Sequence, residues 1–141
     1  MSSLELPLAN YEDDFRHIAE NYEETLRVLD IGCGDFDYRE DIKGYLKGVV
    51  SDVTGEKPEI EFYGIDIDEE RISDAELDHA ETADVREGLQ YQDDFFDAVI
   101  SNHAMCQLEP EETETVWQES ERVVKDHGLV LHGPHNIRSN S

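Results

Sequence analysis

The sequence predicts an α/β domain in which helices cover both faces of a mostly parallel five-stranded sheet. Short apolar runs of strand length alternate along the chain with segments whose apolar residues recur every three or four positions. Turns rich in glycine and acidic residues separate these runs. Alternation of this kind is typical of a parallel sheet enclosed between two helical layers, which is a three-layer sandwich.

Apolar spacing assigns each element. Helices are expected where apolar residues share one face, at about 15–22, 35–50, 68–80 and 111–126. Strands are expected where β-forming residues run together, at 26–31, 60–66, 82–85, 95–101 and 129–132. Gly55 and Pro58 should break the second helix, and Gly128 should close the last one. Residues 1–10 are expected to form a flexible arm, and 11–141 a single domain, as the length of 141 residues indicates.

The chain is strongly acidic. It carries 36 acidic residues against 11 basic ones, a formal net charge of −25. A surface of this sign repels phosphate backbones and anionic lipid, so we expect neither a nucleic-acid nor a membrane partner. No apolar stretch reaches the roughly 18 residues of a membrane span. The first residues contain no basic region followed by an apolar one, so a cytoplasmic protein is expected.

This acidity has three explanations. A disordered chain would scatter its apolar residues, whereas here they gather in runs that can build a core. A mimic of nucleic acid would place its carboxylates in one patch, and here they are spread along the chain. Acid-rich, lysine-poor surfaces suit a very salty cytoplasm, where salt screens the repulsion between carboxylates. We favour this halophilic explanation.

Cysteine and histidine spacing predicts neither a disulfide framework nor a metal site. Cys33 and Cys106 fall in separate loops after predicted strands, so free thiols are expected. His132 and His135 are three apart, but Gly133 and Pro134 between them indicate a turn. No cysteine lies at a zinc-like spacing from either histidine.

Chemistry-bearing residues follow three of the predicted strands. The turn Gly32-Cys33-Gly34 lets a ligand approach the backbone without a side-chain clash, although a turn without a ligand is the alternative. Asp37 stands where a dinucleotide fingerprint needs its last glycine, which disfavours NAD or FAD and favours a cationic or zwitterionic ligand. Asp66 can accept from two ribose hydroxyls, with Asp68 as a helix cap. Asp84 can accept from an exocyclic amine or remain a solvated charge.

In this order, the motifs resemble those of the class I S-adenosylmethionine-dependent methyltransferases. The resemblance covers about 26–133 and rests on Val28–Gly34, Tyr63–Asp66, Ala83–Asp84 and Phe96–His103. The segment Arg122–Gly128 is similar to the Arg-Val-Leu-Lys-Pro-Gly-Gly turn of the small-molecule type. The resemblance implies a Rossmann-like fold, S-adenosylmethionine as cofactor and a small-molecule acceptor.

The resemblance also implies a cofactor site. Gly32, Cys33 and Gly34 would hold the methionine part, and Asp66 would bind the ribose. Asp84 and Val85 would flank the adenine, and Ser101 would line the methyl-transfer side. The same predicted site includes two more residues, Asp30 and Ile67.

The sequence departs from the family pattern at two places. Phe36 occupies the position of the third loop glycine and is expected to narrow the cofactor site. The family sheet normally continues with two more strands, whereas this sequence ends at Ser141, soon after its fifth. Leu129–His132 would then be an open edge, which predicts a homo-oligomer or a larger assembly that covers 128–135.

Methyl transfer asks little of the protein, because the sulfonium is already activated and positioning supplies much of the catalysis. A general base helps when the acceptor carries a proton. His103 and His132 are candidates for it, or they are ordinary loop histidines. Three functions stay open: a methyltransferase on a small-molecule or unknown acceptor, a catalytically inactive methyltransferase-like subunit of an assembly, and another nucleotide-binding module. We favour the first.

Overall fold

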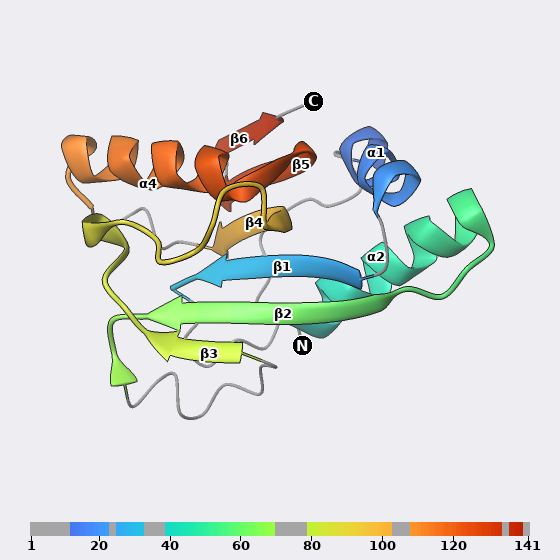
Figure 1. Ribbon diagram of the computed structural model, residues 1–141, viewed down its shortest axis with the longest axis horizontal. Coiled ribbons are helices and arrows are strands. Elements are labelled where there is room, and N and C mark those ends of the chain that lie inside the picture. Colours follow the sequence, from blue (N-terminus) through green and yellow to red (C-terminus); the bar gives the residue numbers. More distant parts are fainter. Residues whose placement is uncertain are drawn as a thin grey trace.

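The computed structural model describes residues 12–22, 25–32, 39–69, 79–102, 108–133 and 136–139. Six strands form one sheet in the order β3-β2-β1-β4-β5-β6 (Figure 1). The parallel strands are β1 (Thr25–Ile31), β2 (Glu59–Asp66), β3 (His79–Thr82), β4 (Phe96–Asn102) and β5 (Val124–Gly133). The last strand, β6 (Asn136–Ser139), is antiparallel to β5. The expected α/β sandwich with its mostly parallel sheet is confirmed, and one short strand is added to it.

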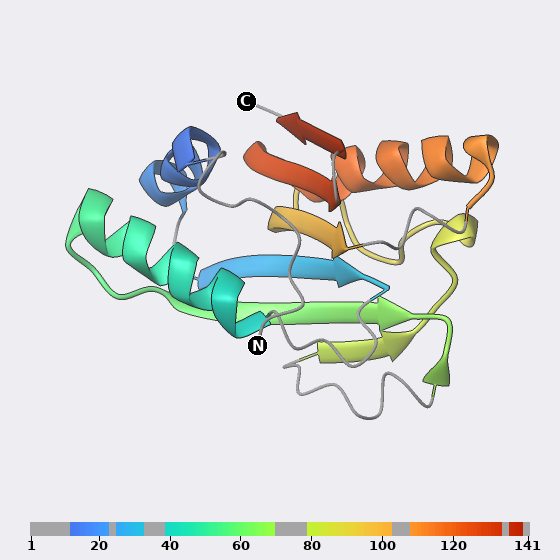
Figure 2. The ribbon, with the colours of Figure 1, turned by 180° about the vertical axis from the view of Figure 1, so that it is seen from behind.

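Helices cover both faces of the sheet because side chains of each buried strand alternate between two cores. On one face, α1 (Glu12–Asn21) and α2 (Arg39–Thr54) pack against the sheet through Phe15, Ile18, Leu46 and Val50, among others. On the other face, α4 (Pro110–Val123) packs through Val116, Trp117 and Val123. The view from behind has α2 on the near side of the sheet (Figure 2). No helix among these described segments is long and apolar enough to cross a membrane.

The connection between α4 and β5 shows why position 128, the end of the segment Arg122–Gly128, has to be glycine. The helix ends at Val123, earlier than the expected 126. The pairing of β4 with β5 shifts register between Phe96 and Ala98. A Cβ on Gly128 would lie 2.4 Å from Val124 Cγ2 and 2.7 Å from the Asp97 carbonyl oxygen. Gly128 is therefore needed for this close approach and does not close the helix.

Two other boundaries differ from the expectation. α2 continues through Thr54 and ends at Gly55, whose φ of 77° suits glycine. β3 occupies His79–Thr82, where an end of the third helix was expected, and the expected strand at 82–85 is a turn that enters a 3₁₀ helix, η2 (Val85–Glu87). Most of the expected helix at 68–80, as well as the expected arm at 1–10, lies outside the described residues.

The open edge expected at Leu129–His132 is not there. β5 pairs with β4 on one side and with β6 on the other, where Leu129 faces Ser139 and His132 faces Asn136. Backbone hydrogen bonds to β6 satisfy the groups that an edge strand would expose. The reason for assembly through 128–135 is therefore lost.

Candidate active site

The candidate site lies at the carboxyl ends of the parallel strands. The register puts Asp30 of β1 beside Gly64 and Ile100, and Asp66 of β2 beside Thr82. The arrowheads of these strands point to the end of the molecule where η2 and the first turn of α4 lie (Figure 1). Ligands of open parallel sheets bind at this end, where the strand order reverses. Here the reversal falls at β1, which lies between β2 and β4.

β1 enters the site through Asp30 and Gly32. The Asp30 side chain is fully buried. The Gly32 N–H donates to the Ile65 carbonyl oxygen at 2.8 Å, so the contact between β1 and β2 continues one residue beyond the strand. Gly32 then turns the chain with a φ of 70°, in the left-handed region that favours glycine. Cys33, Gly34 and Phe36 of the same predicted loop lie outside the described residues.

Asp66 orders the turn that follows β2. Its Oδ1 accepts the Asp68 N–H at 2.9 Å, and its backbone oxygen accepts the Ala83 N–H at 3.0 Å. The Asp66 side chain is buried, but the next residue, Ile67, is 62% exposed. This turn therefore presents a large apolar side chain to solvent beside a buried carboxylate. Such a residue at the end of a strand is suited to contact a ligand.

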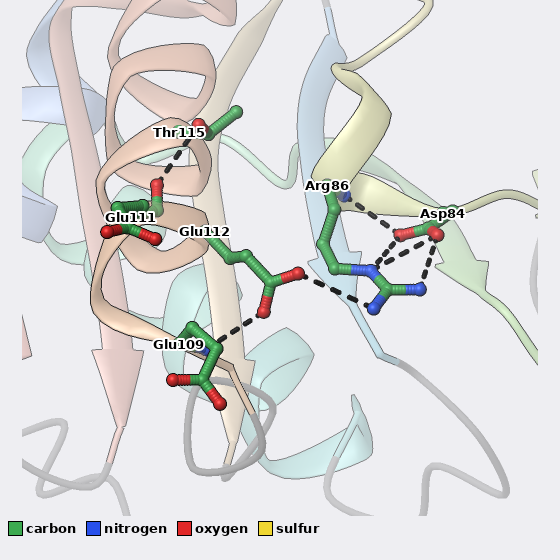
Figure 3. A network of polar contacts seen from close by, with 6 residues as sticks. All are labelled: Asp84, Arg86, Glu109, Glu111, Glu112 and Thr115. Carbon is green, nitrogen blue, oxygen red and sulfur yellow. Dashed lines mark hydrogen bonds and ion pairs between the residues drawn. The ribbon is translucent and has the colours of Figure 1, made fainter.

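Asp84 is already engaged by a neighbouring arginine. It is the N-cap of η2, and its Oδ1 accepts the Arg86 backbone N–H at 3.0 Å. The Arg86 guanidinium binds the same carboxylate through Nε at 2.9 Å to Oδ1 and through Nη2 at 2.7 Å to Oδ2 (Figure 3). These contacts hold the pKa of Asp84 below its ordinary value and raise the pKa of Arg86. The carboxylate is therefore ionised and fully occupied.

The same arginine reaches the first turn of α4. Arg86 Nη1 lies 3.5 Å from Glu112 Oε2, and Glu112 Oε1 accepts the Glu109 N–H at 2.9 Å (Figure 3). The second contact belongs to a capping box that starts the helix, with Pro110 in its first turn. A continuous polar network thus joins Asp84 to α4. Sequence reasoning did not find Arg86 or Glu112, although the Glu-Pro-Glu-Glu start of the helix was a signal for the cap.

Ser101 and His132 form a buried contact between β4 and β5. Ser101 Oγ lies 2.6 Å from His132 Nδ1, and Ser120 Oγ of α4 lies 3.1 Å from Nε2. The Trp117 ring contacts the imidazole edge-on, with centroids 4.6 Å apart. Both ring nitrogens are thus engaged by serine hydroxyls, as a neutral imidazole with one donor and one acceptor allows. His132 therefore lies in a strand and a core, not in a loop where it could take a proton from an acceptor.

Of the remaining residues predicted for the site, some lie within the described segments and some do not. Val85 begins η2, beside Asp84, and is half-buried. His103, the other candidate base, and Cys106 lie outside the described residues. Within the described segments, no group of three or more possible metal ligands converges.

Comparison with known proteins supports a methyltransferase fold. Residues 29–132 match the family model described as a methyltransferase domain. A comparison with curated proteins finds no match. Among solved structures, a Pyrococcus horikoshii protein is similar with a TM-score of 0.59 and 22% identity over 88% of this chain and 56% of its own.

Two archaeal methyltransferase structures are also similar. An S-adenosylmethionine-dependent methyltransferase from Archaeoglobus fulgidus has a TM-score of 0.55 and 23% identity, covering 86% of this chain and 50% of its own. The Haloferax volcanii complex of the Trm112 methyltransferase activator with a methyltransferase has a TM-score of 0.54 and 23% identity, covering 86% and 53%. The chain thus spans about half the length of these structures. With its family match and this sheet order, the chain belongs to the class I S-adenosylmethionine-dependent methyltransferases.

Proposed function

We propose that this domain binds S-adenosylmethionine at the carboxyl ends of β1, β2 and β3 and transfers its methyl group to a small molecule. The observation that carries the proposal is the hydrogen bond that holds the turn after β1 beside the end of β2. Gly32, in a left-handed conformation, is hydrogen-bonded to Ile65, the residue before the buried Asp66. A backbone without a Cβ and a buried carboxylate are thereby fixed side by side.

The residues present fit this ligand. Gly32 presents a backbone without a Cβ to the methionine part, Cys33 and Gly34 follow it in the sequence as further candidates, and the buried Asp30 lies two residues before it. Asp66 accepts from the ribose hydroxyls, and the exposed Ile67 packs against the base. Asp84 and Val85 border the adenine. The net charge of −25 favours a cationic sulfonium over an anionic cofactor.

Bound S-adenosylmethionine supplies an activated methyl group, so the protein has to position the acceptor and exclude water. The buried contact between Ser101 of β4 and His132 of β5 ties the ends of these two strands together. His103 stays the candidate base for an acceptor that carries a proton. The acceptor itself, a small molecule, is a prediction from the family resemblance.

A catalytically inactive methyltransferase-like domain that serves as a structural or interaction subunit of an assembly is the alternative. Burial of His132 removes one of the two candidate bases, which favours this alternative. One similar structure is a methyltransferase held in a complex with the Trm112 activator, so a protein partner is a reasonable part of the proposal. A cytoplasmic location and adaptation to high salt stay predictions from the sequence, whereas the homo-oligomer expected from an open edge at 128–135 has lost that basis because β6 pairs with β5.

Calorimetric titration of S-adenosylmethionine in concentrated KCl tests cofactor binding, which the proposed function requires and the structural alternative does not. We expect Asp66→Ala to weaken binding at least about tenfold, since it removes charge-assisted hydrogen bonds. Asp68→Ala, which removes an equal charge from the same turn but leaves Asp66 in place, is the matched control and should bind like the wild type. Failure of the folded wild type to bind would contradict the proposal.

A further inference from the structure

Arg86 is the residue of the site that the family resemblance does not explain. We propose that Arg86 competes with the adenine amine for the Asp84 carboxylate, so that this ion pair lowers cofactor affinity and salt restores it. The inference rests on the proposed function, in which Asp84 borders the adenine. It assigns Arg86 a regulatory role at that site.

Occupancy of the carboxylate is the first step. Oδ1 of Asp84 accepts the backbone N–H and the Nε–H of Arg86, and Oδ2 accepts from Nη2 at 2.7 Å and from Nε at 3.2 Å. This is the two-pronged arrangement in which arginine binds carboxylates most strongly. An amine that approaches Asp84 therefore has to displace at least one prong of the guanidinium.

Glu112 gives the displaced arginine a second partner. Its Oε2 lies 3.5 Å from Arg86 Nη1, on the side of the guanidinium opposite Asp84 (Figure 3). The contact is long, and a small shift of the arginine toward α4 would shorten it. Arg86 is thus placed between two carboxylates, one at the site and one on the helix. It can leave the first without losing every ion pair.

The pair is exposed enough to respond to salt. The Arg86 side chain is 44% exposed, and those of Asp84 and Glu112 are 23% and 31% exposed. At about 1 M salt the Debye length falls to roughly 3 Å, which weakens exposed ion pairs. A hydrogen bond from a neutral adenine amine is less affected because it carries no net charge. Rising salt should therefore shift Asp84 from Arg86 toward the nucleoside.

Two ligands that differ at one group isolate this competition. S-adenosylhomocysteine carries the purine amine, and S-inosylhomocysteine has an oxo group in its place; both are net neutral zwitterions near pH 7. Arg86→Met keeps an apolar stem and the backbone N–H that caps η2, while it frees the carboxylate. We expect it to tighten S-adenosylhomocysteine about two- to fivefold, the range for one exposed ion pair, and to leave S-inosylhomocysteine nearly unchanged.

Salt and two further variants complete the calorimetric test. Over the KCl range in which circular dichroism is constant, wild-type affinity for S-adenosylhomocysteine should rise with salt relative to that of Arg86→Met. Arg86→Lys, which keeps the charge and loses the two-pronged geometry, should fall between them. Glu112→Gln keeps the helix cap through Oε1 and should not tighten binding.

The possible failures are distinguishable. If wild-type protein binds neither ligand, the proposed function fails. If it binds S-adenosylhomocysteine with the same affinity and salt dependence as Arg86→Met, the competition is wrong while the function stands. Equal tightening of both ligands, or tightening by Glu112→Gln, would also overturn it, because the effect would then come from a loosened loop or helix.

Discussion

The two ends of α4 are each tied by an arginine to the segment that follows β3, but in different ways. At the last turn, Arg122 Nη1 and Nη2 donate to the carbonyl oxygens of Tyr91 and Leu89, each at 2.8 Å. Its Nε binds Glu119 at 2.9 Å, and Glu119 in turn accepts the Leu89 N–H at 2.8 Å. At the first turn, Arg86 of η2 instead binds side-chain carboxylates, those of Asp84 and Glu112.

The difference separates a structural anchor from an adjustable contact. Backbone carbonyls have to be satisfied, so bonds to them fix a chain segment and not only a side chain. The segment fixed by Arg122 carries Tyr91 and Phe95, whose rings stack with each other and pack edge-on against Tyr63 and Phe96. Loss of that anchor would loosen an aromatic cluster. Loss of the Arg86 contacts would free a site carboxylate and little else.

The strongest test of this contrast is Arg122→Met. It leaves the carbonyls of Leu89 and Tyr91 without their Arg122 donor and takes the guanidinium away from the half-buried Glu119, so we expect it to lower the free energy of unfolding by about 2–4 kcal/mol. Urea unfolding followed by circular dichroism measures the change. Near-ultraviolet circular dichroism should also show weaker aromatic packing around Tyr91.

Arg86→Met is the matched control, because the same substitution at the other, more exposed arginine should cost much less stability than Arg122→Met. An equal loss for both variants would mean that the two ends of α4 play the same structural part. The contrast would then be wrong.

The middle of α4 gives the second test. Ser120→Ala leaves Nε2 of the buried His132 without the Ser120 hydroxyl, and we expect a loss of about 1–2 kcal/mol in unfolding free energy. Ser51→Ala on the exposed face of α2 is the control and should change stability little or raise it slightly. If both variants lose the same amount, the buried contact contributes nothing specific.

The strands that sequence reasoning found are those that are buried. β1, β2 and β4 consist of apolar runs, so their positions were predicted closely. β3 was misplaced because all four of its residues are exposed, and β6 was missed because its segment is short and polar. Backbone pairing defines both strands, and pairing leaves no hydrophobic pattern in the sequence.

Within the candidate site, positions were predictable and partners were not. Asp66 was expected at the end of a strand and is the last residue of β2, whereas Asp84, which fell within the expected strand at 82–85, lies in the turn that enters η2. The engagement of Asp84 by Arg86 and the burial of His132 depend on side chains that meet only after folding. Ser101 and His132 are 31 residues apart, and no local pattern relates them. A histidine after an apolar run can equally be a base or a core residue.

Acid titration sharpens the comparison at the last turn. The Arg122 side chain holds the pKa of Glu119 below its ordinary value of 4.5, with further help from the Leu89 N–H. A lowered folded-state pKa gives stability that is present above the unfolded value and lost as pH falls through the folded one. The stability gap between wild type and Glu119→Gln should therefore be constant near neutral pH and shrink below about pH 4.5. A stability gap that does not change with pH would show that the charge of the Glu119 carboxylate does not contribute to its contact with Arg122.

The smallest expected effect is at the first turn. Glu112→Gln keeps the Oε1 acceptor of the Glu109 N–H and removes the charge that faces Arg86, so it should cost about 0.5 kcal/mol or less in unfolding free energy. Urea unfolding at low and high KCl measures it, and the cost should fall as salt screens the pair. Glu119→Gln at pH 7 is the reference at the other end of the helix and should cost more. If Glu112→Gln costs as much, the first turn is an anchor too, and the freedom of Arg86 to leave Asp84 would have no structural basis.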